Sequence, residues 1–164
     1  SAQSSIALRA ESYFMLYWIF MNFESNYDQA LHYCKSLTDQ YPLNFLHKAM
    51  YIKNLLLLKK YDEAEKFIAS NSDKESNSFY LAQLSIFRGI IQEKKYHNYP
   101  LAAEFYNKGI NDLSMFNTYG NEFAAYGYFG LSRIGEINGD SHERRINRRK
   151  AMDIVDFKKI NFDE

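Results

Sequence analysis

The tetrad Tyr27-Asp28-Gln29-Ala30 recurs 34 residues later as Tyr61-Asp62-Glu63-Ala64. In both copies an aromatic residue, an acidic residue and a small residue occupy the same places. A recurrence at this distance is typical of stacked helix-turn-helix units, in which each unit buries its apolar face only against its neighbours. The repeat therefore predicts an all-α chain built from antiparallel helix pairs.

Helical periodicity and turn residues extend this pattern along the chain. Pro42 follows the end of one predicted helix, and Pro100 fits the first turn of another, where its missing N–H is harmless. Gly127, Gly130 and Gly135 fall within a single predicted helix and permit close approach of neighbouring helices. About eight helices are predicted as four pairs: 6–23 with 27–41, 44–60 with 61–70, 78–94 with 99–113, and 121–138 with 141–157.

Length and composition predict a single helical domain over residues 1–164. The chain shows no break in composition and no linker rich in Ser, Gly or Pro. Its 14 Tyr and 13 Phe, with only two Pro and seven Gly, favour long helices with bulky packing. Because a strongly apolar segment begins almost at once, we expect the chain to be a fragment of a longer protein.

The charge and hydropathy of the chain limit the kinds of partner it can bind, and its cysteine content bears on the compartment. The 20 basic and 20 acidic side chains cancel, so no global field attracts the chain to nucleic acid or to an anionic membrane. No apolar run is long enough to predict insertion into a membrane. The single Cys34 forms no intramolecular disulfide and leaves the compartment open.

The first predicted helix is apolar on two sides. One face combines Phe14, Tyr17, Trp18 and Met21, and the opposite face combines Met15, Leu16, Ile19 and Phe20. Only one of these faces can pack on the second helix, and a contiguous apolar patch left in water marks an interface or an aggregation risk. We therefore expect the second face to be covered by curling of the chain or by self-association through the N-terminal helix.

The chain resembles the tetratricopeptide repeat (TPR) family over nearly its whole length, from about Glu11 to Asp156. The features that carry the resemblance are a short turn inside each pair, a small residue early in the second helix, another small residue seven residues later, and often a proline before the next unit. The matching positions are Ala30 with Pro42, Ala64, Ala102 with Gly109, and Gly139-Asp140 with Ala151. Departures are Trp18, Ile52 and Arg144, where the family usually has Gly or Ala. The resemblance implies a right-handed α-α superhelix, a TPR-like solenoid.

In this family the first helices of the pairs line an inner wall that binds peptides. By the register of the resemblance, the wall is formed here by Met15, Leu16, Ile19, Met50, Lys53, Leu57, Ile86, Phe87, Ile90, Tyr126, Phe129 and Arg133. Relatives that grip acidic C-terminal peptides use several basic and amide side chains, whereas only Lys53 and Arg133 are available here. A wall rich in Met and Phe suits an amphipathic helix instead. The alternative is that these residues are ordinary core and that the register is shifted by one residue.

Residues with catalytic or ligand-binding chemistry are scattered. The four histidines fall on four different predicted elements, and a metal site needs several convergent ligands. No motif of a metalloprotease, a phosphate-binding loop or a serine hydrolase is present. We therefore predict neither an enzyme nor a bound cofactor or metal.

The strongest charge cluster is basic and is formed by Arg144, Arg145, Arg148, Arg149 and Lys150. Spacings of four residues align these side chains on adjacent stripes of one helix. They would form either a site for phosphate or an acidic peptide, or the solvated outer face that a terminal repeat needs for solubility.

The sequence favours a non-catalytic interaction scaffold that binds an apolar or amphipathic peptide segment, or a second copy of itself. A regulatory sensor domain is the alternative, in which a short peptide or small molecule is bound and a signal passes to a domain outside this sequence. A reading frame that continues into a DNA-binding or kinase domain would favour the sensor.

Overall fold

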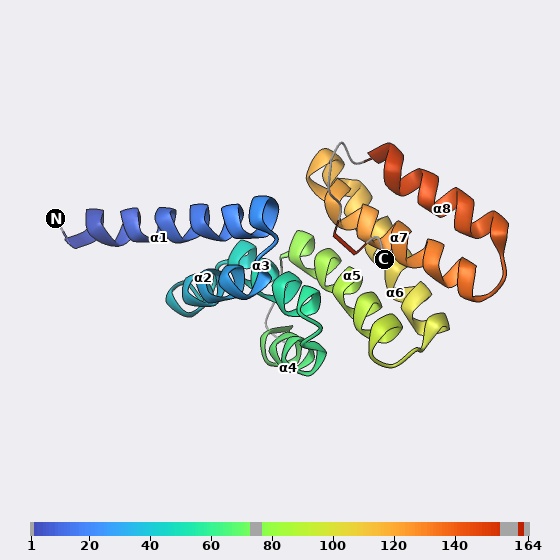
Figure 1. Cartoon of the computed structure of the whole chain (residues 1–164), viewed down its shortest axis with the longest axis horizontal. Helices are drawn as coiled ribbons and strands as arrows, with labels where there is room; N and C mark the ends of the chain where they lie inside the picture. Colours follow the sequence, from blue (N-terminus) through green and yellow to red (C-terminus); the bar gives the residue numbers. More distant parts are fainter. Residues whose placement is uncertain (1, 73–76, 155–160, 163–164) are drawn as a thin grey trace. The chain divides into compact units, whose positions relative to one another are not determined.

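The computed structural model describes residues 2–72, 77–154 and 161–162 of the chain. Over these ranges the regular structure is helical and contains no strand, which confirms the predicted all-α class. A π-helical segment (Phe20–Glu24) follows α1, and a 3-10 segment (Ser114–Gly120) joins α6 to α7. The α-helices labelled in Figure 1 are α1 (Ala2–Ile19), α2 (Tyr27–Gln40), α3 (Phe45–Leu57), α4 (Tyr61–Ser72), α5 (Ser78–Lys94), α6 (Tyr99–Leu113), α7 (Asn121–Ile137) and α8 (Ser141–Ile154).

Polar caps fix where most of these helices begin. At the starts of α2, α3, α5 and α6 an asparagine side chain accepts a hydrogen bond from the backbone N–H three residues later; the four residues are Asn26, Asn44, Asn77 and Asn98. Asp140 accepts in the same way from the N–H of Glu143 at the start of α8, at 3.0 Å. Such caps satisfy N–H groups that have no partner inside the helix. The predicted continuation of α8 to Phe157 lies outside the described residues.

The chain divides into two compact units, Ser1–Ala64 and Glu65–Glu164. The boundary falls inside α4, where the sequence has no linker and no change in composition. The single domain over residues 1–164 and the right-handed superhelix are properties of both units together, and they stay predictions.

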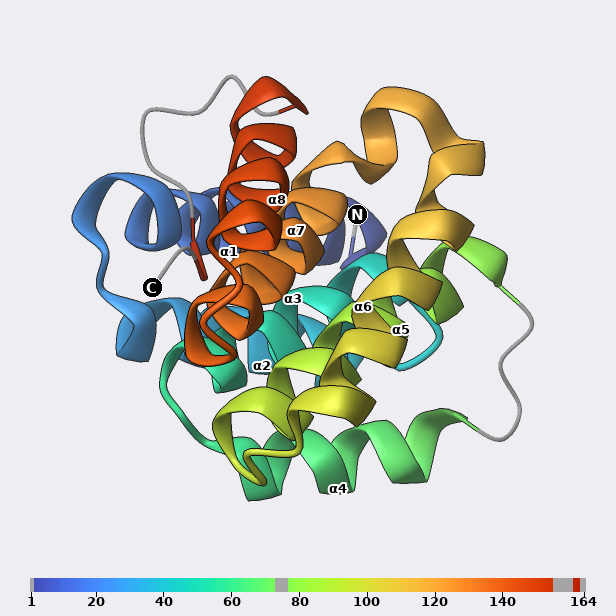
Figure 2. The same cartoon turned by 90° about the vertical axis from the view of Figure 1, so that its right-hand side faces the viewer.

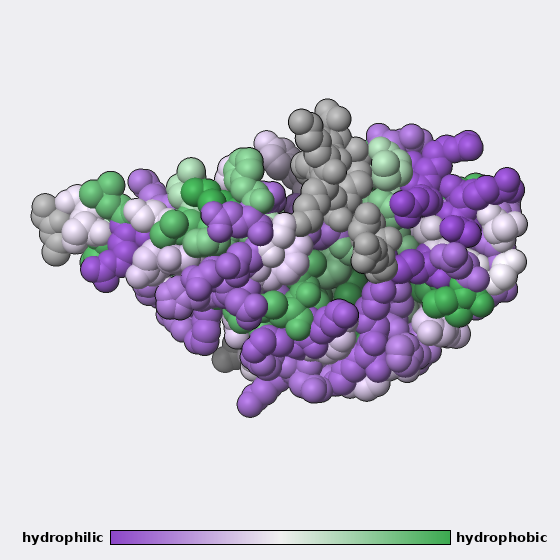
Figure 3. Space-filling model, in the orientation of Figure 1, coloured by the Kyte–Doolittle hydropathy of each residue, from purple (hydrophilic) through white to green (hydrophobic). Residues whose placement is uncertain are grey.

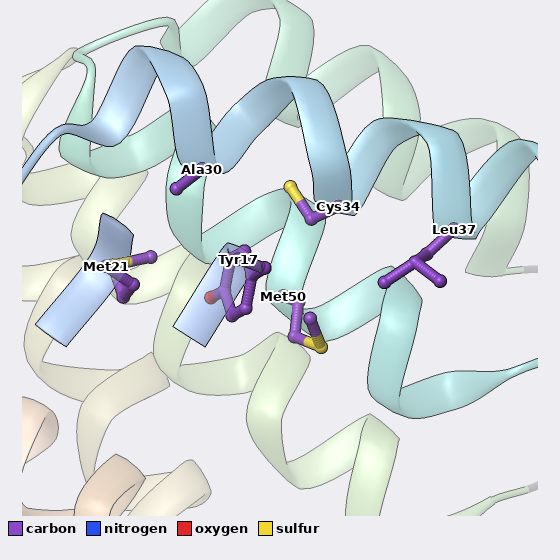
Figure 4. Close-up of a cluster of buried hydrophobic side chains, with 6 residues drawn as sticks. All are labelled: Tyr17, Met21, Ala30, Cys34, Leu37 and Met50. Carbon is purple, nitrogen blue, oxygen red and sulfur yellow. The ribbon is translucent and has the colours of Figure 1, made fainter. Parts of the chain in front are cut away.

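In the first unit α2 packs on both α1 and α3. Figure 4 shows their shared core, formed by Tyr17, Met21, Ala30, Cys34, Leu37 and Met50. The Asn54 amide of α3 donates to the backbone carbonyl of Tyr27 at 2.6 Å and so ties α3 to the start of α2. The small residues Ala30, Ala64 and Ala102 are all fully buried, as the repeat predicts.

The second unit is built on close contacts among α5, α6 and α7, with α8 packed on α7 (Figure 2). The pairs α5 with α6 and α7 with α8 are joined by short turns at 95–98 and 138–140. Helix α5 also contacts α7, so the first helices of consecutive pairs lie against each other. The carboxylate of Glu65, in α4, accepts from Lys95 at 2.6 Å and holds that part of α4 to the turn after α5.

The fully buried ring of Tyr106, on α6, fills a slot that two glycines leave open. A Cβ added to Gly89 of α5 would lie 2.6 Å from the Tyr106 ring, and one added to Gly130 of α7 would overlap it. The sequence predicts the close approach at Gly130, and the structure confirms it. Three helices thus meet around one aromatic ring.

Candidate protein-binding surfaces

Most residues of the predicted inner wall lie inside their units. A partner can contact only side chains that are exposed. Among the twelve wall residues, the exposed ones are Met15 and Ile19. Leu16, Leu57 and Arg133 are half-buried. The remaining members are buried: Met50, Lys53, Ile86, Phe87, Ile90, Tyr126 and Phe129. Their burial agrees with the alternative that these residues are core, because the first helices pack against neighbours in each unit. Peptide binding by the twelve residues stays a prediction.

An exposed apolar stripe does occur on α1 and its π-helical continuation. We define the α1 stripe as Met15, Trp18, Ile19 and Phe23, whose exposed fractions are 54%, 45%, 37% and 70%. The rings of Trp18 and Phe23 meet edge to face, with centroids 5.1 Å apart. In Figure 3 hydrophobic side chains gather along α1 on the face shown. This unit thus presents large apolar groups to water along one helix, the kind of surface that marks an interface.

The structure corrects which residues of the first helix face the core. Phe20, which the sequence groups with Met15, Leu16 and Ile19, packs on the core of the first unit and stacks on Tyr33 with centroids 5.8 Å apart. Trp18, which the sequence groups with the buried Tyr17 and Met21, is exposed. Each helical residue adds about 100°, so Phe20 lies about 60° from Tyr17, whereas Trp18 lies about 100° from it. Met15 and Ile19 of the second face are exposed together with Trp18. The expectation that this face is covered by curling of the chain or by self-association stays a prediction.

In the second unit, Glu93 of α5, Arg133 of α7 and Tyr106 of α6 form a buried polar network. The Arg133 guanidinium donates to the two carboxylate oxygens of Glu93, with Nε–Oε1 and Nη2–Oε2 distances of 2.6 and 2.9 Å. The Tyr106 hydroxyl donates to Oε2 of Glu93 at 2.6 Å. Only 3% of the Glu93 side chain and 13% of the Arg133 side chain are exposed. Such a two-fold contact of guanidinium with carboxylate is both strong and directional.

The network shifts the ionisation of its members. Burial is the largest single effect and disfavours the charged forms of both Glu93 and Arg133, but their mutual hydrogen bonds, their opposite charges and the Tyr106 hydrogen bond together outweigh it. The pKa of Glu93 is therefore lowered and that of Arg133 is raised. Burial and the Glu93 carboxylate raise the pKa of Tyr106 well above its usual value. The Glu93 carboxylate therefore contributes stability above its unfolded pKa, and this contribution is lost as the pH falls through the folded value.

Arg133 has a further partner near the end of the chain. Its Nη1 donates to the backbone carbonyl of Phe162. The Phe162 ring meets the Tyr126 ring edge to face, with centroids 5.0 Å apart and an interplanar angle of 76°. Sequence reasoning identified Arg133 and Tyr126 but missed Glu93, Tyr106 and Phe162. The available signal was that Glu93 and Arg133 each follow an apolar wall residue, Ile86 or Tyr126, by seven residues on the same helix face.

The basic cluster of α8 is exposed throughout. Arg144 pairs with Glu136 at 3.2 Å, Arg148 lies over the Phe129 ring at 5.5 Å, and Lys150 lies over the Tyr128 ring at the same distance. These contacts with α7 fit the solvated outer face better than a convergent phosphate site.

The described residues also show how far the chain is suited to metal binding, membrane insertion and thiol chemistry. No group of three His, Cys, Asp or Glu side chains in this part of the chain is placed to hold a metal ion. None of its helices combines the length and the apolar character needed to cross a membrane. Cys34 is buried in the core of the first unit, and burial raises the pKa of its thiol to about 12. A thiol with this pKa stays protonated and unreactive at neutral pH.

His47 is expected to make the first unit sensitive to mild acid. It is 9% exposed, its Nδ1 has no hydrogen-bond partner among the described residues, and burial lowers its pKa from 6.5. The stability due to neutral His47 is present above pH 6.5 and is lost as the pH falls through the folded pKa, by at most about 1.4 kcal/mol per pH unit. Urea unfolding at about pH 7.5 and about pH 5.5, on either side of the histidine range, measures this loss.

The variant His47→Gln is the control for this expectation. Between the two pH values its free energy of unfolding should fall by less than that of the unaltered chain, because glutamine does not titrate. Equal losses in both chains would contradict a role for His47. The exposed His142 provides the matched substitution, His142→Gln, which should leave the loss unchanged.

Comparison with known proteins yields no relative of this chain. No family model, no curated protein and no solved structure matches it. Function must therefore be inferred from the residues and their geometry.

Proposed function

We propose that this chain is a non-catalytic protein-interaction scaffold of TPR-like organisation, which binds apolar or amphipathic protein segments through the α1 stripe. The organisation is supported by the consecutive helix pairs, by the packing of α5 on α7 and by buried alanines at equivalent places of three pairs.

The observation that carries the proposed function is the exposure of Met15, Trp18, Ile19 and Phe23 along one helix. Scattered surface hydrophobics are common, but here four large groups adjoin on one side of one helix, opposite the buried Tyr17 and Met21. Covering them would remove apolar area from water, at roughly 25 cal/mol per Å² before the costs of association. A partner with an apolar stripe of its own fits this surface.

A second copy of the chain has such a stripe, and its approach meets no net repulsion. The 20 basic and 20 acidic side chains cancel. A two-fold axis would place one α1 stripe against the same stripe of the partner copy, which is the commonest symmetry of soluble oligomers. We therefore expect self-association through α1 when no other partner is present.

Replacing Met15 and Ile19 with glutamate should abolish this association, because burying two unpaired carboxylates costs more than the apolar contact supplies. Sedimentation equilibrium over a range of concentrations measures the mass. The only tryptophan of the chain, Trp18, lies in the stripe, so quenching of its fluorescence by acrylamide reports whether the stripe is covered. Quenching should fall as the mass of the unaltered chain rises.

The control variant is Leu43→Glu. Leu43 is 84% exposed and lies in the turn between α2 and α3, away from the stripe in sequence. It should leave both the mass and the quenching unchanged. A native chain that stays monomeric at every concentration, with Trp18 equally quenched throughout, would remove the support for the proposed function.

A further inference from the structure

We propose that Arg133 and Tyr126 form a binding site for an aromatic residue of a peptide, and that Phe162 of this chain occupies the site in the structure. The proposal concerns the second unit and does not rest on the α1 stripe. The ligand class is a peptide segment that offers one aromatic ring and the backbone carbonyl of the same residue.

The carbonyl requirement comes from the donors of Arg133. A guanidinium has five N–H groups. Glu93 accepts from Nε and Nη2, whereas Nη1 donates to Phe162 O. Arg133 is largely buried, and a buried donor left without an acceptor carries its full desolvation cost. The site therefore needs an acceptor at the position that the Phe162 carbonyl fills.

Glu93 determines that this acceptor is neutral. Its carboxylate, bonded at both oxygens, already balances the charge of Arg133. Lys94 Nζ also lies 3.5 Å from Glu93 Oε1, but 31% of its side chain is exposed, so water screens its charge. A carboxylate placed at Nη1 would still add a second negative charge beside the buried Glu93 carboxylate, at a desolvation cost that the paired guanidinium compensates only weakly. A backbone carbonyl supplies the hydrogen bond without that charge. The site thus differs from a carboxylate clamp for acidic C-termini.

Tyr126 provides the aromatic half of the site. Its hydroxyl donates to Glu122 one helical turn earlier, and its ring meets Phe123 edge to face with centroids 5.7 Å apart. These contacts fix the ring that Phe162 touches. Edge-to-face pairs contribute stability beyond the burial of apolar area, so an aromatic side chain is preferred over an aliphatic one.

Occupation by the same chain predicts competition. Phe162 belongs to the same chain as Arg133, so its local concentration at the site is on the order of millimolar. An external segment must therefore displace Phe162 in order to bind. Replacing Phe162 with alanine keeps the backbone carbonyl but removes the ring contact with Tyr126. The tethered segment should then hold the site more weakly, so that a peptide with an aromatic ring can displace it.

The experiment uses the full chain, with and without the substitution Phe162→Ala, and a synthetic peptide with the sequence of residues 160–164. NMR of chains with labelled aromatic rings should detect a cross-peak between the Tyr126 and Phe162 rings in the unaltered chain. The peptide should shift the Tyr126 ring signals of the Phe162→Ala chain with an affinity at least tenfold higher than in the unaltered chain. Far-UV circular dichroism confirms that both chains are folded.

The matched control is the same peptide with its phenylalanine replaced by alanine, which keeps the backbone carbonyl and the charges. It should bind the Phe162→Ala chain at least tenfold more weakly than the parent peptide. The proposal is overturned if the unaltered chain gives no cross-peak between the two rings. It is also overturned if the two peptides bind equally, or if millimolar peptide leaves the Tyr126 signals of the Phe162→Ala chain in place. None of these results depends on the mass of the chain or on the fluorescence of Trp18, which are the measurements that test the proposed function.

Discussion

Replacing Glu93 with leucine should lower the free energy of unfolding by about 3–5 kcal/mol, because it leaves the Arg133 guanidinium buried without its counter-charge. The change also removes the acceptor of the Tyr106 hydroxyl, which is fully buried on α6. Urea unfolding at neutral pH, followed by far-UV circular dichroism, measures the loss.

The double variant Glu93→Leu/Arg133→Met separates the unpaired charge from loss of packing. Removing both charges should recover a large part of the lost stability, since a buried ion pair replaced by apolar groups of similar volume is often close to neutral. The exposed Glu104 gives the matched single change, Glu104→Leu, which should cost little. Equal losses in the single Glu93 variant and the double variant would show that burial of the unpaired guanidinium is not the cause.

Replacing Gly130 with alanine should destabilise the second unit by about 2 kcal/mol, although alanine is the better helix former by about 1 kcal/mol. The new Cβ would overlap the Tyr106 ring. The ring cannot retreat, because Gly89 of α5 approaches it from another helix and the hydroxyl is bonded to Glu93. The same urea measurement applies.

Gly127, on the same helix, provides the comparison. A Cβ there would lie 2.9 Å from Cδ1 of Ile86 and from Cγ1 of Ile110, which are aliphatic side-chain atoms; a rotation of either side chain can relieve the contact. Gly127→Ala should therefore cost clearly less than Gly130→Ala, and the gain in helix propensity offsets part of that cost. If Gly130→Ala left the unfolding midpoint unchanged, the slot around Tyr106 would not be rigid.

Local signals in the sequence are enough to place the helices of the described residues. The tetrads at 27–30 and 61–64, the asparagine caps and Pro100 act on neighbouring residues, so their effect can be read without knowing the tertiary packing. The division into two units inside α4 has no such signal, because it depends on how many contacts form on each side.

The candidate surfaces were only partly predictable for the same reason. The excess of apolar residues on the first helix indicated an uncovered face, but the angular positions of Trp18 and Phe20 decide which residues form it. The apolar residues of α5 and α7 assigned to the wall have the same helical spacing whether that face of the helix lines a binding groove or packs in the core. The Arg133 site joins α5, α6, α7 and Phe162, and sequence spacing does not report contacts between residues so far apart.

The network around Glu93 also determines how the second unit can open. Because Glu93 of α5 accepts from both Tyr106 of α6 and Arg133 of α7, separating α5 breaks all of these hydrogen bonds, and separating α6 or α7 breaks the bonds that its own residue makes to Glu93. These helices therefore form one cooperative block. Helix α8 packs on α7 and contributes no residue to the network, so it can detach in a local fluctuation at a lower free energy than the block. Resistance to local unfolding thus decreases from the three-helix block toward α8.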